Sequence, residues 1–162
     1  MGYLGPEGTF SEQALLDVPD LAGAERVPLP LMTDVLFAVH EGRVDLGVVP
    51  VENAIEGSVN AIVDTLAFDV DVLIQREVVM SVQQHLMGLK GATVAGLTDI
   101  VSIPHATAQA RTFLRRELPN VRTRAANSTA EGAQWVAEAG DPQVGAIGNE
   151  LAADIYGLEI LA

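Results

Sequence analysis

Val48-Val49-Pro50-Val51-Glu52-Asn53-Ala54-Ile55-Glu56-Gly57-Ser58-Val59 joins a strand to a helix through a polar loop. The apolar run over 46–49 predicts a buried strand, which Pro50 ends because proline cannot donate to a sheet ladder. Helical spacing follows over 59–66. In open α/β sheets, ligands bind outside the carboxyl ends of strands. Glu52 and Asn53 lie at such an end, so two interpretations stay open: a ligand-binding loop, or an ordinary polar strand-to-helix connection.

The same strand-loop-helix pattern recurs along the whole chain. We expect strands over 2–5, 25–29, 46–49, 72–82, 98–103, 121–125, 145–147 and 158–161. Helices are expected over 9–16, 34–40 (capped by Thr33), 58–68, 104–118, 127–139 and 150–156. Strands that alternate with helices define the α/β class, with mainly parallel sheets and flanking helices.

Composition and charge exclude several classes of protein. The chain has 162 residues, a net charge of −13 and no cysteine. An acidic chain lacks the basic face that nucleic acid requires. No apolar run approaches the roughly 18 to 20 residues of a membrane span, and the N-terminus does not resemble a signal peptide. We therefore expect a cytoplasmic protein with no nucleic-acid or membrane partner, whose anionic ligands are held by local donors.

Four loops share one design, in which a strand is followed by small polar residues and then by the start of a helix. They span 5–12, 50–58, 102–109 and 127–131. A helix N-terminus presents free backbone N–H groups and about half a positive charge. Our hypothesis is that several such termini hold a small polyanion. The alternative is that Thr9 to Glu12 and Ser128 to Glu131 are simple capping boxes.

Five segments, taken together, resemble the catalytic domain of prephenate dehydratase and occur in family order. They are Gly2-Tyr3-Leu4-Gly5-Pro6-Glu7-Gly8-Thr9-Phe10-Ser11, Val49 to Val59, Ser102 to Gln109, Asn127-Ser128-Thr129-Ala130-Glu131, and Ala146 to Leu158.

The resemblance implies one catalytic domain over 1–162 with a two-lobed, type II periplasmic-binding-protein-like α/β fold and a site in the inter-lobe cleft. Lobe one is expected over about 1–72 and again from about 159, and lobe two over about 73–158. The implied activity is that of a lyase, which converts prephenate to phenylpyruvate, water and carbon dioxide on the route to phenylalanine. The resemblance also implies no metal or organic cofactor, and a homo-oligomer, either a dimer or a tetramer.

Site residues are carried over by position. Those expected to be catalytic are Asn53, Glu52, Ser102, Gln109 and Glu131. Those expected to bind substrate are Thr9, Ser11, Gly57, Ser58, Ser128, Thr129 and His105. Three of them have a stated structural alternative. Glu131 could cap its helix, the Ser102 hydroxyl could bond to a backbone group at the strand end, and Gln109 could be a surface residue.

The chain departs from the family pattern in places. Ser102-Ile103-Pro104-His105 stands where Ser-His-Pro-Gln is usual, and Ala54 replaces a serine. The family's Thr-Arg-Phe segment and phenylalanine-sensing ACT domain are not in this sequence, which predicts a truncated enzyme or a binding-competent fragment with little turnover. The alternatives are a prephenate decarboxylase and a non-catalytic small-anion binding module.

Overall fold

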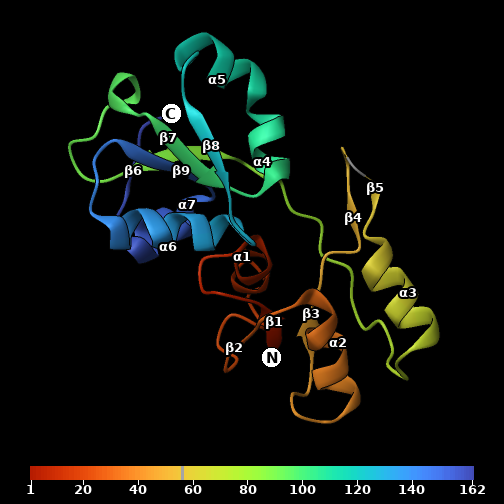
Figure 1. Cartoon of the computed structure of the whole chain (residues 1–162). Coiled ribbons are helices and arrows are strands. Elements are labelled where there is room, and N and C mark those ends of the chain that lie inside the picture. The colour runs from red at the N-terminus through yellow and green to blue at the C-terminus, as the bar shows by residue number, and fades with distance from the viewer. Residues whose placement is uncertain (56) are drawn as a thin grey trace. The chain divides into compact units, whose positions relative to one another are not determined.

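The computed structural model describes residues 1–55 and 57–162 (Figure 1). Contacts between residues divide the chain into two units. Unit 1 comprises Met1–Pro6 and Phe10–Met80, and unit 2 comprises Glu7–Thr9 and Ser81–Ala162. The chain therefore changes unit three times, twice within its first ten residues.

Unit 1 is built on a small parallel sheet. Its strands, in the order β2-β1-β3, are β1 (Gly2–Leu4), β2 (Val27–Leu29) and β3 (Gly47–Val48). Its helices are α1 (Phe10–Leu16), α2 (Met32–His40) and α3 (Asn60–Phe68). A separate antiparallel pair, β4 (Glu52–Asn53) and β5 (Gly57–Ser58), connects β3 to α3.

Helix α2 packs directly on the sheet of unit 1. A Cβ atom added to Gly47 would lie 2.6 Å from Cγ1 of Val35, so glycine in β3 permits the close approach of the helix. Leu15 of α1, Val35 of α2 and Ile62 of α3 are fully buried. Each helix of this unit therefore contributes at least one fully buried apolar side chain.

Unit 2 contains a five-stranded mixed sheet in the order β10-β6-β9-β7-β8. Its strands are β6 (His85–Gly88), β7 (Asp99–Ser102), β8 (Arg122–Ala125), β9 (Val144–Gly148) and β10 (Glu159–Ile160). Strands β7, β8 and β9 are parallel to one another, whereas β6 pairs antiparallel with both β9 and β10. The helical elements are η1 (Val94–Gly96), α4 (Pro104–Gln109), α5 (Arg111–Glu117), α6 (Thr129–Ala139) and α7 (Glu150–Tyr156).

Successive residues of the central strands enter two different apolar clusters, because side chains alternate between the faces of a sheet. In β7, Ile100 joins the cluster with Ala106 and Leu114 of α4 and α5. Its neighbour Val101 joins the cluster under α6 and α7. Figure 1 shows α6 and α7 on one side of this sheet and α4 and α5 near its other side. Both faces of the sheet are therefore covered.

The expected α/β class is confirmed, and so are most of its elements. The strand expected over 72–82 is wrong, since residues 70–84 form no regular element. Its apolar side chains are largely exposed, with Ile74 at 73% and Val79 at 87%. β-branched residues favour strands only when a neighbouring strand pairs with them, and this segment has none among the described strands.

Smaller corrections concern element ends. Thr33 is not a cap but lies inside α2, whose N-cap is Leu31. The single helix expected over 104–118 is two helices that meet at Ala110. Ser58 belongs to β5 rather than to the following helix.

The expected lobe limits and the contact division differ at three places. Residues 7–9 belong to unit 2, although we expected them in lobe one. Residues 73–80 have their contacts in unit 1, although we expected lobe one to end near residue 72. Residues 159–162 belong to unit 2, because β10 pairs with β6 rather than returning to the first lobe.

Candidate functional site

Three helices in unit 2 begin at the same edge of the sheet. Parallel strands β7, β8 and β9 end at Ser102, Ala125 and Gly148, and each leads into a helix that starts within a few residues. The carboxyl ends of neighbouring parallel strands share one edge, which is where α/β proteins bind their ligands. This edge therefore gathers polar side chains that are far apart in the sequence.

Ser102 lies fully buried at the end of β7. Its hydroxyl donates a hydrogen bond to the carbonyl oxygen of Ile147 in β9, over 2.7 Å. A hydroxyl has one proton, so Ser102 can accept a further hydrogen bond while this contact lasts but cannot donate one. The geometry supports its structural role directly.

Ser128 and Glu131 form a capping box at the start of α6. The Ser128 Oγ accepts from the Glu131 backbone N–H over 3.0 Å. Both carboxylate oxygens of Glu131 are engaged by Asn127, one by its backbone N–H and the other by its side-chain Nδ2 at 3.1 Å. Glu131 therefore caps its helix, as the structural alternative predicted.

The backbone at the start of α6 offers donors. Thr129 and Ala130 are buried, and their backbone N–H groups have no hydrogen bond within the part of the chain that the structure describes. The first N–H groups of any helix lack an intrahelical acceptor. Helix α6 has 11 residues. The aligned peptide dipoles of a helix give its N-terminus a partial positive charge, which attracts an anion.

Sequence reasoning missed Asn149 as a candidate. It is almost fully buried at the N-cap of α7, and its Oδ1 accepts from the Ala152 N–H over 3.1 Å. The signal was available, because asparagine directly after a buried strand and before a helical pattern is a preferred N-cap. Asn149 extends the polar edge from β7 to β9.

Residues 7–9 pack on α7. The Tyr156 hydroxyl donates to the carbonyl oxygen of Glu7 over 2.8 Å. A Cβ on Gly8, where φ is +88°, would lie 3.1 Å from Cα of Ala152, so only glycine permits this close approach. Thr9, the third residue of the segment, is buried in unit 2.

His105 and Gln109 both belong to α4 and are half-buried. No hydrogen bond of the Gln109 side chain is found among the described residues. The short helix follows β7 directly, with Pro104 at its first position, where a missing N–H has no cost. These two residues therefore lie within seven positions of Ser102 in the chain, on the helix that follows its strand.

The remaining candidates belong to unit 1. In the β4–β5 pair, Glu52 lies opposite Ser58 and Asn53 opposite Gly57. Asn53 is half-buried and its Oδ1 accepts from the Ile55 N–H over 2.9 Å. Glu52, Gly57 and Ser58 are exposed, and Ser11 is half-buried in α1. Glu56 of the motif lies outside the described residues.

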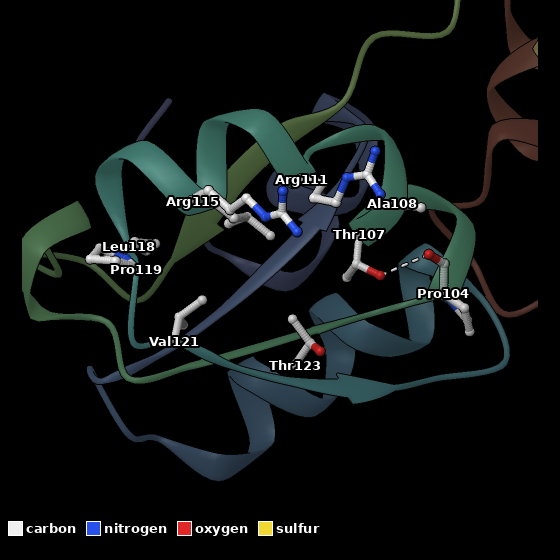
Figure 2. A pocket seen from close by; sticks show the side chains of 10 residues that line it. Pro104, Thr107, Ala108, Arg111, Arg115, Leu118, Pro119, Val121 and Thr123 are labelled. Atoms are coloured by element: carbon white, nitrogen blue, oxygen red, sulfur yellow. Dashed lines mark hydrogen bonds between the residues drawn. The ribbon is translucent and has the colours of Figure 1, made fainter.

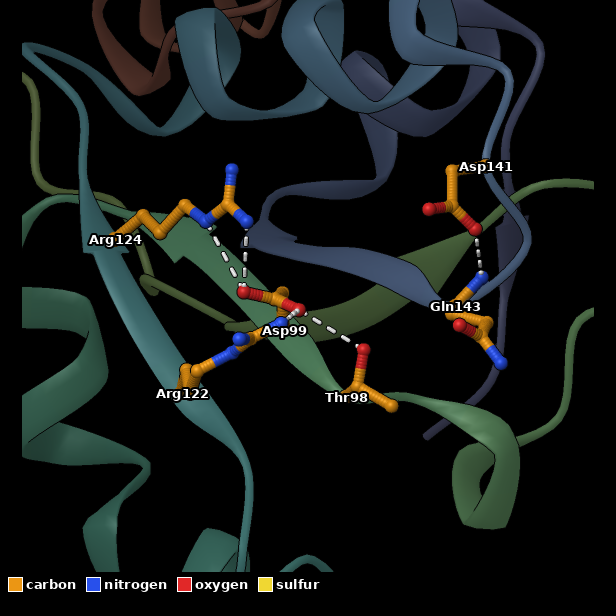
Figure 3. Close-up of polar contacts among 6 residues, drawn as sticks. All are labelled: Thr98, Asp99, Arg122, Arg124, Asp141 and Gln143. Atoms are coloured by element: carbon orange, nitrogen blue, oxygen red, sulfur yellow. Dashed lines mark hydrogen bonds and ion pairs between the residues drawn. The ribbon is translucent and has the colours of Figure 1, made fainter.

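One charged cluster in unit 2 shapes the sheet rather than the candidate site (Figure 3). Asp99 at the start of β7 accepts from Arg122 over 2.7 Å, from Arg124 over 3.0 Å and from the Thr98 hydroxyl over 2.9 Å. Chiefly through the Arg122 hydrogen bond, the pKa of Asp99 falls from 3.8 to about 2. The guanidinium of Arg124 also stacks 5.3 Å from the ring centre of Trp135.

Over residues 1–55 and 57–162, no three histidine, aspartate or glutamate side chains gather closely enough to hold a metal ion. Within the same residues, no helix has both the length and the apolar character needed to cross a bilayer.

The fold and the polar strand ends define the class of protein as an α/β protein of the type II periplasmic-binding-protein-like kind. A family model described as prephenate dehydratase matches residues 1–162. The prephenate dehydratase of Bacillus subtilis (strain 168) is 37% identical over 163 residues, covering 99% of this chain and 57% of that protein. The chain belongs to the prephenate dehydratase family.

Solved structures agree on the fold. A prephenate dehydratase from Arthrobacter aurescens, in complex with L-Phe, has a TM-score of 0.90 at 35% identity, over 99% of this chain and 54% of that one. GqqA, described as a novel type of quorum quenching acylase, has a TM-score of 0.83 at 28% identity, over 99% of this chain and 57% of that one. The chain spans about half the length of the curated relatives it matches.

Proposed function

We propose that this protein is a prephenate dehydratase, a lyase that converts prephenate to phenylpyruvate with loss of carbon dioxide and water. The observation that carries the proposal is the match of the prephenate dehydratase family model to the whole of residues 1–162. The five sequence motifs lie within this match, and three of them contribute to the polar edge of the unit 2 sheet.

The substrate's chemistry suits this edge. Prephenate is a dianion whose ring becomes aromatic when carbon dioxide and the C4 hydroxyl leave, so the reaction is thermodynamically favourable. The protein must hold the carboxylates, orient the ring and assist the leaving hydroxyl. In a chain of net charge −13, backbone N–H donors such as those of Thr129 and Ala130 can bind a carboxylate without a lysine.

We assign proposed roles from position and contacts. Asn53 and Glu52 are proposed to act on the leaving hydroxyl, since they are polar and their carboxylate or amide groups are not enclosed in a buried core. Ser102 is proposed to accept a hydrogen bond from substrate, because its proton is donated to Ile147. Glu131 and Ser128 are proposed to fix the α6 terminus.

The other proposed contacts are with substrate. Thr9, Ser11, Gly57, Ser58, Thr129, His105 and Gln109 are assigned to substrate binding or positioning. We also propose a cytoplasmic homo-oligomer, as the resemblance to the family implies.

The test is a prephenate assay on the 162-residue chain, beside a chimera that joins it to the part of the Bacillus subtilis relative that it does not match. Phenylpyruvate, detected by the absorbance of its enol, is the expected product. If calorimetry detects prephenate binding but neither protein forms product, the protein is a non-catalytic binding module and the proposal is wrong. A decarboxylated, non-aromatic product would identify a decarboxylase, and neither binding nor product would overturn the proposal.

A further inference from the structure

Unit 2 contains a hollow whose lining includes none of the residues predicted to be catalytic or to bind substrate. It has a volume of about 290 Å³ and lies between α4, α5 and the edge strand β8 (Figure 2). Its lining comprises Pro104, Thr107, Ala108, Arg111, Leu114, Arg115, Leu118, Pro119, Val121 and Thr123. Six of these side chains are apolar, two are arginines, two are threonines and none is acidic.

The strand's alternation separates this hollow from the charged cluster around Asp99. Arg122 and Arg124 of β8 pair with Asp99, while Thr123, the residue between them, lines the hollow with Val121. Neighbouring residues of a strand point to opposite faces, so the two features occupy opposite faces of the sheet. Figure 2 shows Thr123 and Val121 beneath the arginines of α5.

The two arginines of the hollow differ from the other six in the chain. Arg26, Arg43, Arg76, Arg116, Arg122 and Arg124 each form an ion pair with a carboxylate. Arg111 and Arg115 have no hydrogen bond or ion pair anywhere in the described chain. Acidic residues outnumber basic ones by 22 to 9, so unpaired arginines gathered at one hollow are unexpected from composition.

The two arginines of the hollow also lie close to each other along α5. Arg111 and Arg115 are four residues apart in α5 and therefore lie on one face of the helix, where like charges repel. Leu114 and Leu118 complete the same face and are buried at the base of the hollow. An anion between the two guanidinium groups would relieve the repulsion, and arginine is suited to bind a carboxylate through two parallel N–H donors.

We propose that this hollow binds a small organic carboxylate with an apolar body. The carboxylate pairs with Arg111 and Arg115, and the apolar part lies against Leu114, Leu118 and Val121. The Thr123 hydroxyl, which has no hydrogen bond among the described residues, is available to donate to the same carboxylate. The Thr107 hydroxyl donates to the Pro104 carbonyl oxygen over 2.8 Å and so can only accept.

The test is a titration of the 162-residue chain with sodium phenylacetate, followed by amide chemical shifts and calorimetry. Acetate and inorganic phosphate serve as comparison probes. We expect the largest shifts at Thr107, Ala108 and Thr123, and phenylacetate to bind at least about tenfold more tightly than either comparison anion, because it also buries a ring. The double variant Arg111→Gln/Arg115→Gln should lose about tenfold or more in affinity for phenylacetate.

Matched controls separate this site from general attraction of anions. Arg116→Gln removes an arginine of the same helix that pairs with Glu117 and lies outside the hollow, so affinity should not change. Ala108→Leu fills the hollow and should weaken phenylacetate but not acetate.

Two kinds of result would reject the proposal. Unchanged affinity in the double variant, or shifts centred on Thr129 and Ala130, would show that the probe binds elsewhere. Equal affinity for phosphate and phenylacetate would show that the hollow does not recognise an apolar group, and would reject the proposed ligand class in favour of a general anion site. None of these readouts depends on turnover, so they are independent of the test of dehydratase activity.

Discussion

The two sets of candidate residues differ in how the protein already uses them. At the strand ends of unit 2, Ser102, Ser128 and Asn149 are buried, and each makes a hydrogen bond that holds a strand or a helix in place. In the β4–β5 pair of unit 1, Glu52 is exposed and Asn53 half-buried. Substitutions in the first set should therefore change stability first, and those in the second set should change activity first.

The largest effect is expected for Asn53→Ala. If Asn53 acts on substrate, turnover of prephenate should fall by about 100-fold, the usual loss when one transition-state hydrogen-bond donor is removed. The melting temperature should hardly move, since the Ile55 N–H that Asn53 accepts from is exposed. Asn53→Asp keeps that acceptor and is the matched control. A chain that unfolds on substitution to alanine would make Asn53 a structural residue.

Gly132→Ala should cause the largest loss of stability. Alanine is normally better than glycine inside a helix by about 1 kcal/mol. At this position, however, the new Cβ would lie 2.9 Å from the backbone oxygen of Val101, so overpacking should cost about 1–3 kcal/mol. Gly23→Ala, with no atom within 4 Å of the new Cβ, is the control. Urea unfolding measures both, and equal stability of the two variants would refute the tight α6–β7 contact.

Ser102→Ala should lower the free energy of unfolding by about 1 kcal/mol, because a buried hydrogen bond to Ile147 is lost. Ser58→Ala removes an exposed hydroxyl and should change it by less than about 0.5 kcal/mol. Thermal unfolding of the two variants gives the comparison. A loss of turnover by Ser102→Ala with unchanged stability would instead favour a direct catalytic role.

Glu131→Gln should have a small effect on stability, of a few tenths of a kcal/mol, since glutamine can still accept from the Asn127 N–H. Turnover should also be retained if Glu131 only caps α6. A strong loss of activity at unchanged melting temperature would show that the carboxylate itself takes part in proton transfer.

Asp99→Asn should destabilise the protein to an extent that depends on pH. The pKa of Asp99 is lowered from 3.8 to about 2 in the folded protein. Its charge therefore stabilises the fold above pH 4, and this contribution is lost as the pH falls from about 4 to 2. The arginine partners are exposed, at 71% and 48%, which screens the pair. Melting curves of native and variant protein should converge over that pH range.

Local patterns in the sequence predicted much of this arrangement. The Ser128 to Glu131 box was predictable because a helix cap depends on residues three positions apart. The α/β class followed from strands alternating with helices, and most element positions were right. These features rest on short-range spacing, which a sequence displays directly.

The features that were not predicted depend on distant partners. The β-branched run over 72–82 has the composition of a strand but no strand beside it, while His85–Gly88, with no β-branched residue, forms β6 between β9 and β10. Residues 7–9 join unit 2 through Tyr156, which lies about 150 positions later in the chain. The arginine-lined hollow likewise combines residues of α4, α5 and the edge strand β8, which local spacing does not bring together.

The strand order of unit 2 has a consequence for synthesis on the ribosome. Strand β6 lies between β9 and β10, so none of its sheet partners exists until roughly 60 further residues have emerged. At about 5–20 residues per second, that delay lasts about 3–12 s. Leu86 and Met87, which are buried on opposite faces in the finished sheet, have no partner strand during this interval. The nascent chain therefore carries an apolar segment whose sheet partners are still to be made. The parallel sheet of unit 1, in contrast, has all of its strands as soon as Val48 has emerged.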